Sequence, residues 1–211
     1  MTQDKDDHKR PHLRLVVDNG EKRNTRPADR GEEFIPLDEL VARRDNFRTL
    51  FYTDLSPWQA KAYERLERFL AARDWPYGLD PEHGRLMVLP IGIVCPEAVE
   101  YGSAPQDEVL IYVAEDLEGN GLSLSVEMIL PFFSDDEAVM EEAFLYSTPI
   151  HQYGTIFLEE NHQDGLLDLI YRLTFPLFPP ALSGGLLDRL FSVAAFEFRE
   201  TCRILAEYPE G

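Results

Sequence analysis

The fold is decided by residues 109–128, which read VLIYVAEDLEGNGLSLSVEM. An apolar run at Val109–Ala114 is followed by Glu118–Gly121 (EGNG), whose residues tolerate the positive φ angles of a tight turn. After this turn, Leu122–Met128 alternates apolar with polar side chains, which is typical of a strand with one buried face. These residues therefore predict two strands joined by a short turn.

Further strands are predicted on both sides of this pair. Residues 85–94 form an apolar run that reads as a strand, broken or bulged at Pro90 and Gly92. Tyr153–Glu159 and Leu167–Phe175 read as two more strands, connected by the acidic turn Glu160–Gly165. The sequence thus predicts five strands.

Three helices complete the predicted domain. Ser56 and Pro57 mark the start of the first helix, which ends near Asp74. Ser134–Glu137 is a capping box that opens a helix running to about Ser147. A long last helix carries an apolar stripe of Leu187, Leu190, Phe191, Ala194, Phe198, Cys202 and Leu205. The class is α+β, with a mostly antiparallel five-stranded sheet in the order α-β-β-β-α-β-β-α and the first and last helices on the same side.

The first 54 residues differ from the rest of the chain. Residues 1–34 alternate charges of both signs and lack apolar periodicity, so we expect a disordered tail. Leu37–Phe51 has apolar side chains at spacings of three and four, which predicts an amphipathic helix. The predicted organisation is a tail at 1–34, an amphipathic helical extension at 35–54 and an α+β domain at 55–211.

Charge is distributed unevenly along the 211 residues. The segment Leu86–Tyr171 contains no lysine or arginine but 17 acidic side chains, and the whole chain has a net charge of −19. A body this negative repels phosphates and anionic lipids, so we expect neither nucleic acid nor a membrane as partner. The favoured partner is a protein or peptide that offers basic, backbone or apolar groups.

The chain has the features of a cytoplasmic protein. No signal peptide is recognisable at the N-terminus, and no apolar window is long enough for a membrane span. Its two cysteines, Cys95 and Cys202, lie in apolar surroundings far apart in the sequence, which favours reduced, partly buried thiols. A disulfide or a reactive cysteine is the alternative.

Two stretches resemble the YbjN-like family, which has the type III secretion chaperone-like fold. Leu79–Leu89 (LDPEHGRLMVL) is similar to the turn into that family's first strand. Gly154–Glu159 (GTIFLE) and Leu167–Leu173 (LDLIYRL) are similar to its later hairpin and its tyrosine-arginine strand. The resemblance spans roughly residues 57–207 and departs from the family at Tyr146–Pro149, where an asparagine is common. It implies a non-enzymatic, chaperone-like or regulatory protein.

No established catalytic or cofactor motif occurs in the sequence. The densest polar cluster is Glu159–Asp164 (EENHQD), which reads either as a solvated turn or as a site for a divalent cation or acid–base chemistry. The turn is the favoured interpretation, so we expect no catalytic residue, bound metal or cofactor. Arg172 is predicted to form a cross-strand ion pair with Glu127.

Partner binding is predicted on apolar strand faces or a free sheet edge, because helices on one side cannot cover strands that are apolar on both faces. The candidate partner-binding residues are Val88, Ile91, Ile93, Val109, Ile111, Val113, Leu40 and Phe47. Two alternatives remain: a metal-binding protein or enzyme that uses Glu159–Asp164, and an obligate homodimer that covers the apolar face with itself.

Deleting residues 1–51 tests the extension. Burying a large apolar side chain stabilises a protein by roughly 1.5–3 kcal/mol, so the stripe of Leu40, Val41, Phe47, Leu50 and Phe51 should be docked on the body or on a second copy. If the docked helix blocks the partner site, the truncated protein should bind more of a hydrophobic dye and capture an extended peptide more strongly. Unchanged solubility, dye binding and oligomeric state would identify the helix as a linker.

Overall fold

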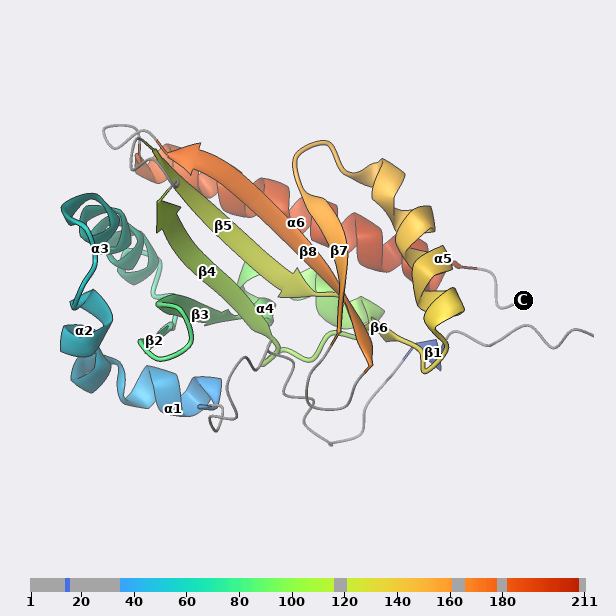
Figure 1. Cartoon of the computed structure of the whole chain (residues 1–211), viewed down its shortest axis with the longest axis horizontal. Helices are drawn as coiled ribbons and strands as arrows, with labels where there is room; N and C mark the ends of the chain where they lie inside the picture. Colours follow the sequence, from blue (N-terminus) through green and yellow to red (C-terminus); the bar gives the residue numbers. More distant parts are fainter. Residues whose placement is uncertain (1–13, 16–34, 116–120, 161–165, 178–181, 209–211) are drawn as a thin grey trace, which may run out of the picture.

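The computed structural model describes residues 14–15, 35–115, 121–160, 166–177 and 182–208. Six antiparallel strands form its main sheet, in the spatial order β2 (Gly78–Asp80), β3 (Leu86–Pro90), β4 (Glu108–Glu115), β5 (Leu122–Ile129), β8 (Leu167–Leu177) and β7 (Thr155–Glu160) (Figure 1). A separate pair joins β1 (Arg14–Leu15) to β6 (Phe132–Phe133). The α+β class is confirmed, with six strands in the main sheet instead of the predicted five.

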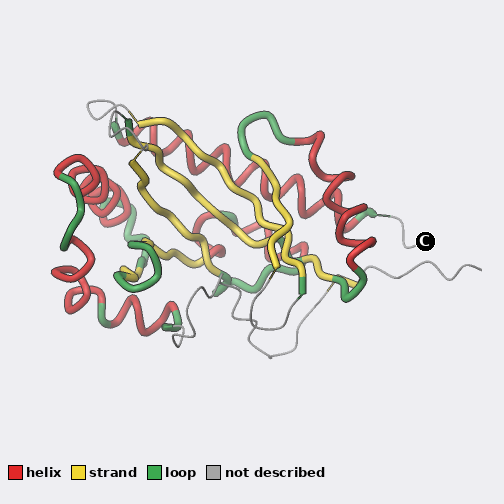
Figure 2. The backbone as a smooth tube through the Cα atoms, in the orientation of Figure 1, coloured by secondary structure: helices red, strands yellow, loops and turns green. Residues whose placement is uncertain are grey.

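The helices are distributed along the whole described chain (Figure 2). They are α1 (Leu37–Ala42), α2 (Arg44–Tyr52), α3 (Pro57–Ala71), α4 (Ile91–Val94), α5 (Glu137–Ser147) and α6 (Gly184–Ala206), with short 3₁₀ helices η1 (Pro96–Tyr101) and η2 (Thr148–Ile150). Among the described residues, no helix has the length and apolar character needed to cross a membrane.

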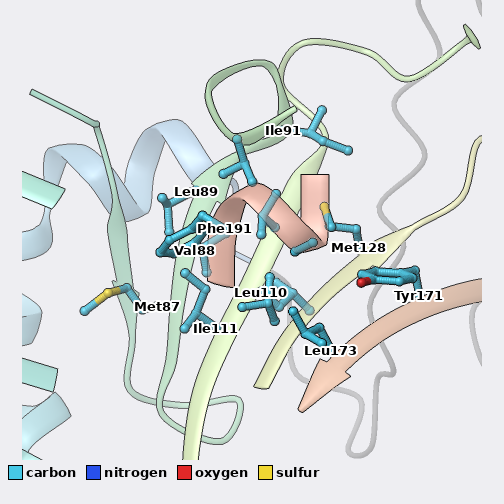
Figure 3. Packing of buried hydrophobic residues seen from close by; sticks show 14 of the residues in the cluster. Met87, Val88, Leu89, Ile91, Leu110, Ile111, Met128, Tyr171, Leu173 and Phe191 are labelled. Carbon is cyan, nitrogen blue, oxygen red and sulfur yellow. The ribbon is translucent and has the colours of Figure 1, made fainter. Parts of the chain in front are cut away.

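One face of the sheet, here called the inner face, carries the core. The hairpin partners β4 and β5 pair from Val109↔Met128 to Glu115↔Leu122, so their large apolar side chains fall in register on this face. Figure 3 shows the labelled part of the cluster, which includes Ile111 of β4, Met128 of β5, Tyr171 of β8 and Phe191 of α6. The alternation seen in the sequence is therefore what builds the core.

Helices α3 and α6 cover the inner face together, as predicted. Phe69 of α3 stacks on Phe191 of α6, with ring centroids 5.6 Å apart and an interplanar angle of 10°. The hydroxyl of Tyr63 in α3 accepts a hydrogen bond from the backbone N–H of Val113 in β4. Figure 1 shows α6 running behind β5 and β8.

Three local predictions need correction. The strand predicted at 85–94 ends at Pro90, because proline has no N–H for a sheet ladder, and Ile91–Val94 turns into α4. The short strand β2 was read as part of a turn, since three residues show no alternation. Asp136, rather than Ser134, caps α5, and its carboxylate accepts the N–H of Ala138.

The amphipathic extension docks on its own chain, at the β2 end of the sheet. It is two helices, α1 and α2, interrupted at Arg43, rather than one. Leu40 and Phe51 are fully buried, and Leu40 lies against Gly78 of β2. The other end of the sheet is β7, where neither α1 nor α2 lies (Figure 1).

A buried carboxylate on α3, Glu67, holds this extension in place. It accepts hydrogen bonds from the hydroxyls of Tyr52 in α2, at 2.8 Å, and of Tyr77, at 3.1 Å. Arg48 of α2 adds an ion pair at 2.8 Å. Because a buried carboxylate without partners is strongly unfavourable, these bonds couple docking of the extension to folding of the body.

Replacing Gly78 by alanine should loosen the extension. The added Cβ would overlap the Cβ of Leu40 and lie 3.0 Å from its carbonyl carbon, so α1 must shift. We expect a loss of about 1–3 kcal/mol in the free energy of unfolding, measured by urea titration. The control is Gly184→Ala, where a Cβ meets nothing within 4 Å. Equal effects of the two substitutions would contradict the close packing of α1 on β2.

Candidate functional site

The strand β7 forms one end of the sheet and is paired on one side. Its partners run from Thr155↔Arg172 to Glu160↔Leu167 in β8. Within the described part of the chain, no backbone hydrogen bond joins β7 to any segment other than β8. Alternate residues of such an edge strand direct their N–H and C=O groups outward, where another strand can pair with them.

The first four residues of β7 lack the protection that is common on edge strands. The strand reads TIFLEE and contains neither lysine nor proline, and its only charges are the two glutamates at its end. Ile156 is buried, Phe157 and Leu158 are half-buried, and Glu160 is exposed. The first four residues are uncharged, and both charges of the strand are negative.

A buried carboxylate on α6, Glu197, positions the start of β7. Its side chain is 4% exposed and accepts three backbone N–H bonds of 2.8–3.0 Å, from Gln152, Tyr153 and Gly154. The hydroxyl of Tyr171 in β8 donates a fourth bond of 2.8 Å. Burial acts to raise the pKa of Glu197, but these hydrogen bonds outweigh it, so its pKa lies below the usual value.

Gly154 is required where β7 begins. A Cβ at this position would lie 2.6 Å from the Cζ and the hydroxyl oxygen of Tyr171, inside van der Waals contact. Tyr171 itself is fully buried and contacts Phe198 of α6 through its ring. The edge strand therefore starts from a rigid anchor built by α6, β8 and the segment before β7.

His151 adjoins this anchor. Its Nε2 lies 2.7 Å from the hydroxyl oxygen of Thr201 in α6, while its buried Nδ1 has no hydrogen-bond partner in the described structure. Burial lowers the pKa of His151, although the nearby Glu197 carboxylate opposes this shift. The neutral imidazole thus contributes packing and one hydrogen bond to the same anchor.

The helix α5 lies next to β7 and contacts it (Figure 1). Its exposed side carries Glu141 and Glu142, while Val139, Met140 and Ala143 are buried. None of the ion pairs between described residues involves these two glutamates or the glutamates of β7. Within the described ranges, the edge therefore lies beside acidic side chains that form no ion pair.

The middle of the opposite, outer sheet face is polar rather than apolar. Glu127 accepts hydrogen bonds from the Tyr112 hydroxyl, at 2.6 Å, and from the Arg172 guanidinium, so the predicted Arg172–Glu127 pair is present. The Arg172 guanidinium also lies 4.3 Å from the ring centroid of Phe157 in β7. These contacts leave the strand edge, rather than this part of the face, as the candidate for docking.

The predicted partner-binding residues are mostly part of the core. Ile93, on α4, is 37% exposed, whereas seven others are at most 8% exposed: Val88, Ile91, Val109, Ile111, Val113, Leu40 and Phe47. The structure brings Leu40 and Phe47 onto the body, but it does not gather the eight residues on one accessible surface. Their role in partner binding stays a prediction.

The acidic turn is described only in part. Glu159 and Glu160 end β7, while Asn161–Asp164 lie outside the described residues. Within the described ranges, no group of three or more histidine, cysteine, aspartate or glutamate residues is placed to hold a metal ion. Cys95 and Cys202 are both buried, and no disulfide joins them.

A shallow hollow lies where α3 meets the ends of β5 and β8. Its volume of about 10 Å³ for water-sized molecules admits roughly one water. It is lined by Trp58, Lys61, Ala62, Arg65, Leu122, Leu177 and Leu182. This hollow is too small to enclose a substrate.

The sequence identified β7 as a strand but not as the end strand of the sheet. The predicted strand at 153–159 overlaps Thr155–Glu160, and Gly154 was noted at its start. The identity of Glu197 as an anchor was missed, because it reads as an ordinary polar position of an amphipathic helix. Glu197 lies in the buried stripe of this helix, between Ala194 and Phe198, and this position could have indicated a buried carboxylate.

Replacing Glu197 by glutamine should release the start of β7. The amide has one acceptor oxygen for four donors, so we expect a loss of about 1–3 kcal/mol and faster hydrogen exchange at Gln152, Tyr153 and Gly154. Because the folded pKa of Glu197 is lowered, its stabilisation is present above about pH 4.5 and is lost as pH falls through the folded pKa. The variant should lack this acid-dependent change in exchange.

Glu200→Gln, on the same helix, is the control for this measurement. Glu200 pairs with Arg199 and Arg203 and does not contact the segment before β7. Its loss should leave exchange at residues 152–154 unchanged. Equal acceleration in both variants would contradict the anchor.

Comparison with known proteins identifies one structural neighbour by title. No protein-family model and no curated protein matches the chain. The chain is similar to a solved structure from E. coli described as "YbjN, a putative transcription regulator", with a TM-score of 0.43 and 11% identity over 66% of this chain and 86% of that one. The neighbour carries the name of the family that the sequence resembles.

Proposed function

We propose that this protein is a non-enzymatic binding module that takes up an extended segment of a partner protein as an additional strand on β7. The observation that carries the proposal is the edge of Thr155–Glu160, whose outward backbone groups pair with no described segment. Strand addition obtains affinity from main-chain hydrogen bonds and selectivity from the side chains that alternate along the added strand.

The two ends of the sheet differ in a way that favours β7. The β2 end is covered by α1 and α2, which are tied to α3 through Glu67. The β7 end is held rigid by Glu197 without being covered by those helices. Because β7 is already held in the conformation that it would have in the complex, less conformational entropy is lost on binding.

Two buried acidic groups, Glu197 and Glu67, support a binding rather than a catalytic function. Glu197 and Glu67 both use their carboxylate oxygens to hold backbone N–H groups or tyrosine hydroxyls. A regulator or chaperone that works by strand addition needs such fixed scaffolding and no reactive group. We place the protein in that class, with a protein or peptide as partner.

Hydrogen exchange with a short peptide tests this function. The probe is a blocked seven-residue peptide of alternating valine and threonine. At saturating concentration, amides at alternate positions of Thr155–Glu160 should exchange at least about tenfold more slowly, because alternate residues point outward. Amides of Gly78–Asp80 in β2 should show no added protection.

N-methylation of the peptide provides the matched control, because the protein itself is left unaltered. Methyl groups on the amides that face β7 should abolish binding, whereas the same groups on the remaining amides should leave it intact. Protection that is absent from β7, or that is insensitive to the methylation pattern, would refute strand addition.

A further inference from the structure

We infer that the partner segment is basic: an extended strand whose lysine or arginine side chains pair with Glu159 and Glu160 at one end of β7. This inference rests on the proposed function and adds the chemistry of the partner. It starts from the two glutamates that end the strand, in a part of the sequence, Leu86–Tyr171, that contains no lysine or arginine.

The two glutamates of β7 lie on opposite faces of the sheet, and both are close to the position of an added strand. Glu159 lies on the outer face, opposite Asp168, and Glu160 lies on the inner face with Ile156 and Leu158. Neighbouring strands lie about 4.8 Å apart, so side chains of an added strand would be within reach of both glutamates. A lysine or arginine of the added strand would be attracted to these two carboxylates.

The protein supplies no cation for these carboxylates among its described residues. Arg172, the base in the adjoining strand, is already paired with Glu127 and lies over Phe157. Glu141 and Glu142 on α5 add to the negative charge beside the edge. A basic partner is therefore both attracted at long range and neutralised on docking.

The same charges disfavour a second copy of the chain at this edge. Two copies that met at this edge would bring together bodies that each carry most of a net charge of −19, and these bodies repel each other. Before the glutamates, Ile156, Phe157 and Leu158 of β7 favour apolar side chains in the partner. The fitting segment therefore has apolar side chains over most of its length and its basic residues at one end.

Three blocked peptides of identical valine–threonine pattern test the charge. They differ at two terminal strand positions, which hold lysine, serine or glutamate. The lysine peptide should protect β7 amides and bind about tenfold more tightly than the glutamate peptide at low salt, with the serine peptide between them. The advantage should shrink at 1 M salt, where the screening length falls to about 3 Å.

Two double variants of the protein test which acidic residues cause the preference for the lysine peptide. In Glu159→Gln with Glu160→Gln, the lysine peptide should lose its advantage over the serine peptide. The control is Asp38→Asn with Glu64→Gln, two exposed acidic residues on α1 and α3, which flank the β2 end; this pair should keep the advantage.

The outcomes separate the two proposals. Equal affinity of the three peptides, all of them protecting β7, would overturn the basic partner and leave strand addition standing. Protection of β7 by none of the peptides would overturn strand addition and the basic partner together. Protection of β7 that rises with protein concentration alone would overturn the basic partner in favour of a second copy.

Discussion

The hydrogen bonds of Glu197 are the constraint on which the candidate site depends. One buried carboxylate joins α6, β8 and the segment that precedes β7, because it accepts three backbone N–H groups and the Tyr171 hydroxyl. Without it, three backbone N–H groups and the buried Tyr171 hydroxyl would lose their acceptor at the point where the chain enters the edge strand. The close contact of Gly154 with the Tyr171 ring makes the same junction sterically tight.

A second buried carboxylate, Glu67, joins neighbouring elements at the opposite end of the sheet. There it gathers Tyr52, Tyr77 and Arg48 so that α1 and α2 cover β2. The two acidic residues thus have different consequences. One ties two helices against the β2 end of the sheet, and the other fixes the segment from which β7 starts.

Much of the fold could be predicted because it depends on local patterns. The alternation in Leu122–Met128 and the spacing in the last helix identify β5 and α6 directly. Prediction failed where the local pattern was too short or ambiguous. The strand β2 has too few residues to show an alternation, and the apolar run Ile91–Val94 is compatible with either a strand or a helix. Of the candidate site, the sequence identified the strand and the Arg172–Glu127 pair, but it showed neither which strand forms the free edge nor the role of Glu197.

The sequence by itself determined the α+β class, the negative charge of the body and the segments that form the central strands. These follow from periodicity and composition, which are properties of neighbouring residues. Only the tertiary structure decided that α1 and α2 cover β2 and that Thr155–Glu160 ends the sheet. The order of strands is set by contacts between residues far apart in the chain, such as Gly154 with Glu197, and those contacts leave no period in the sequence.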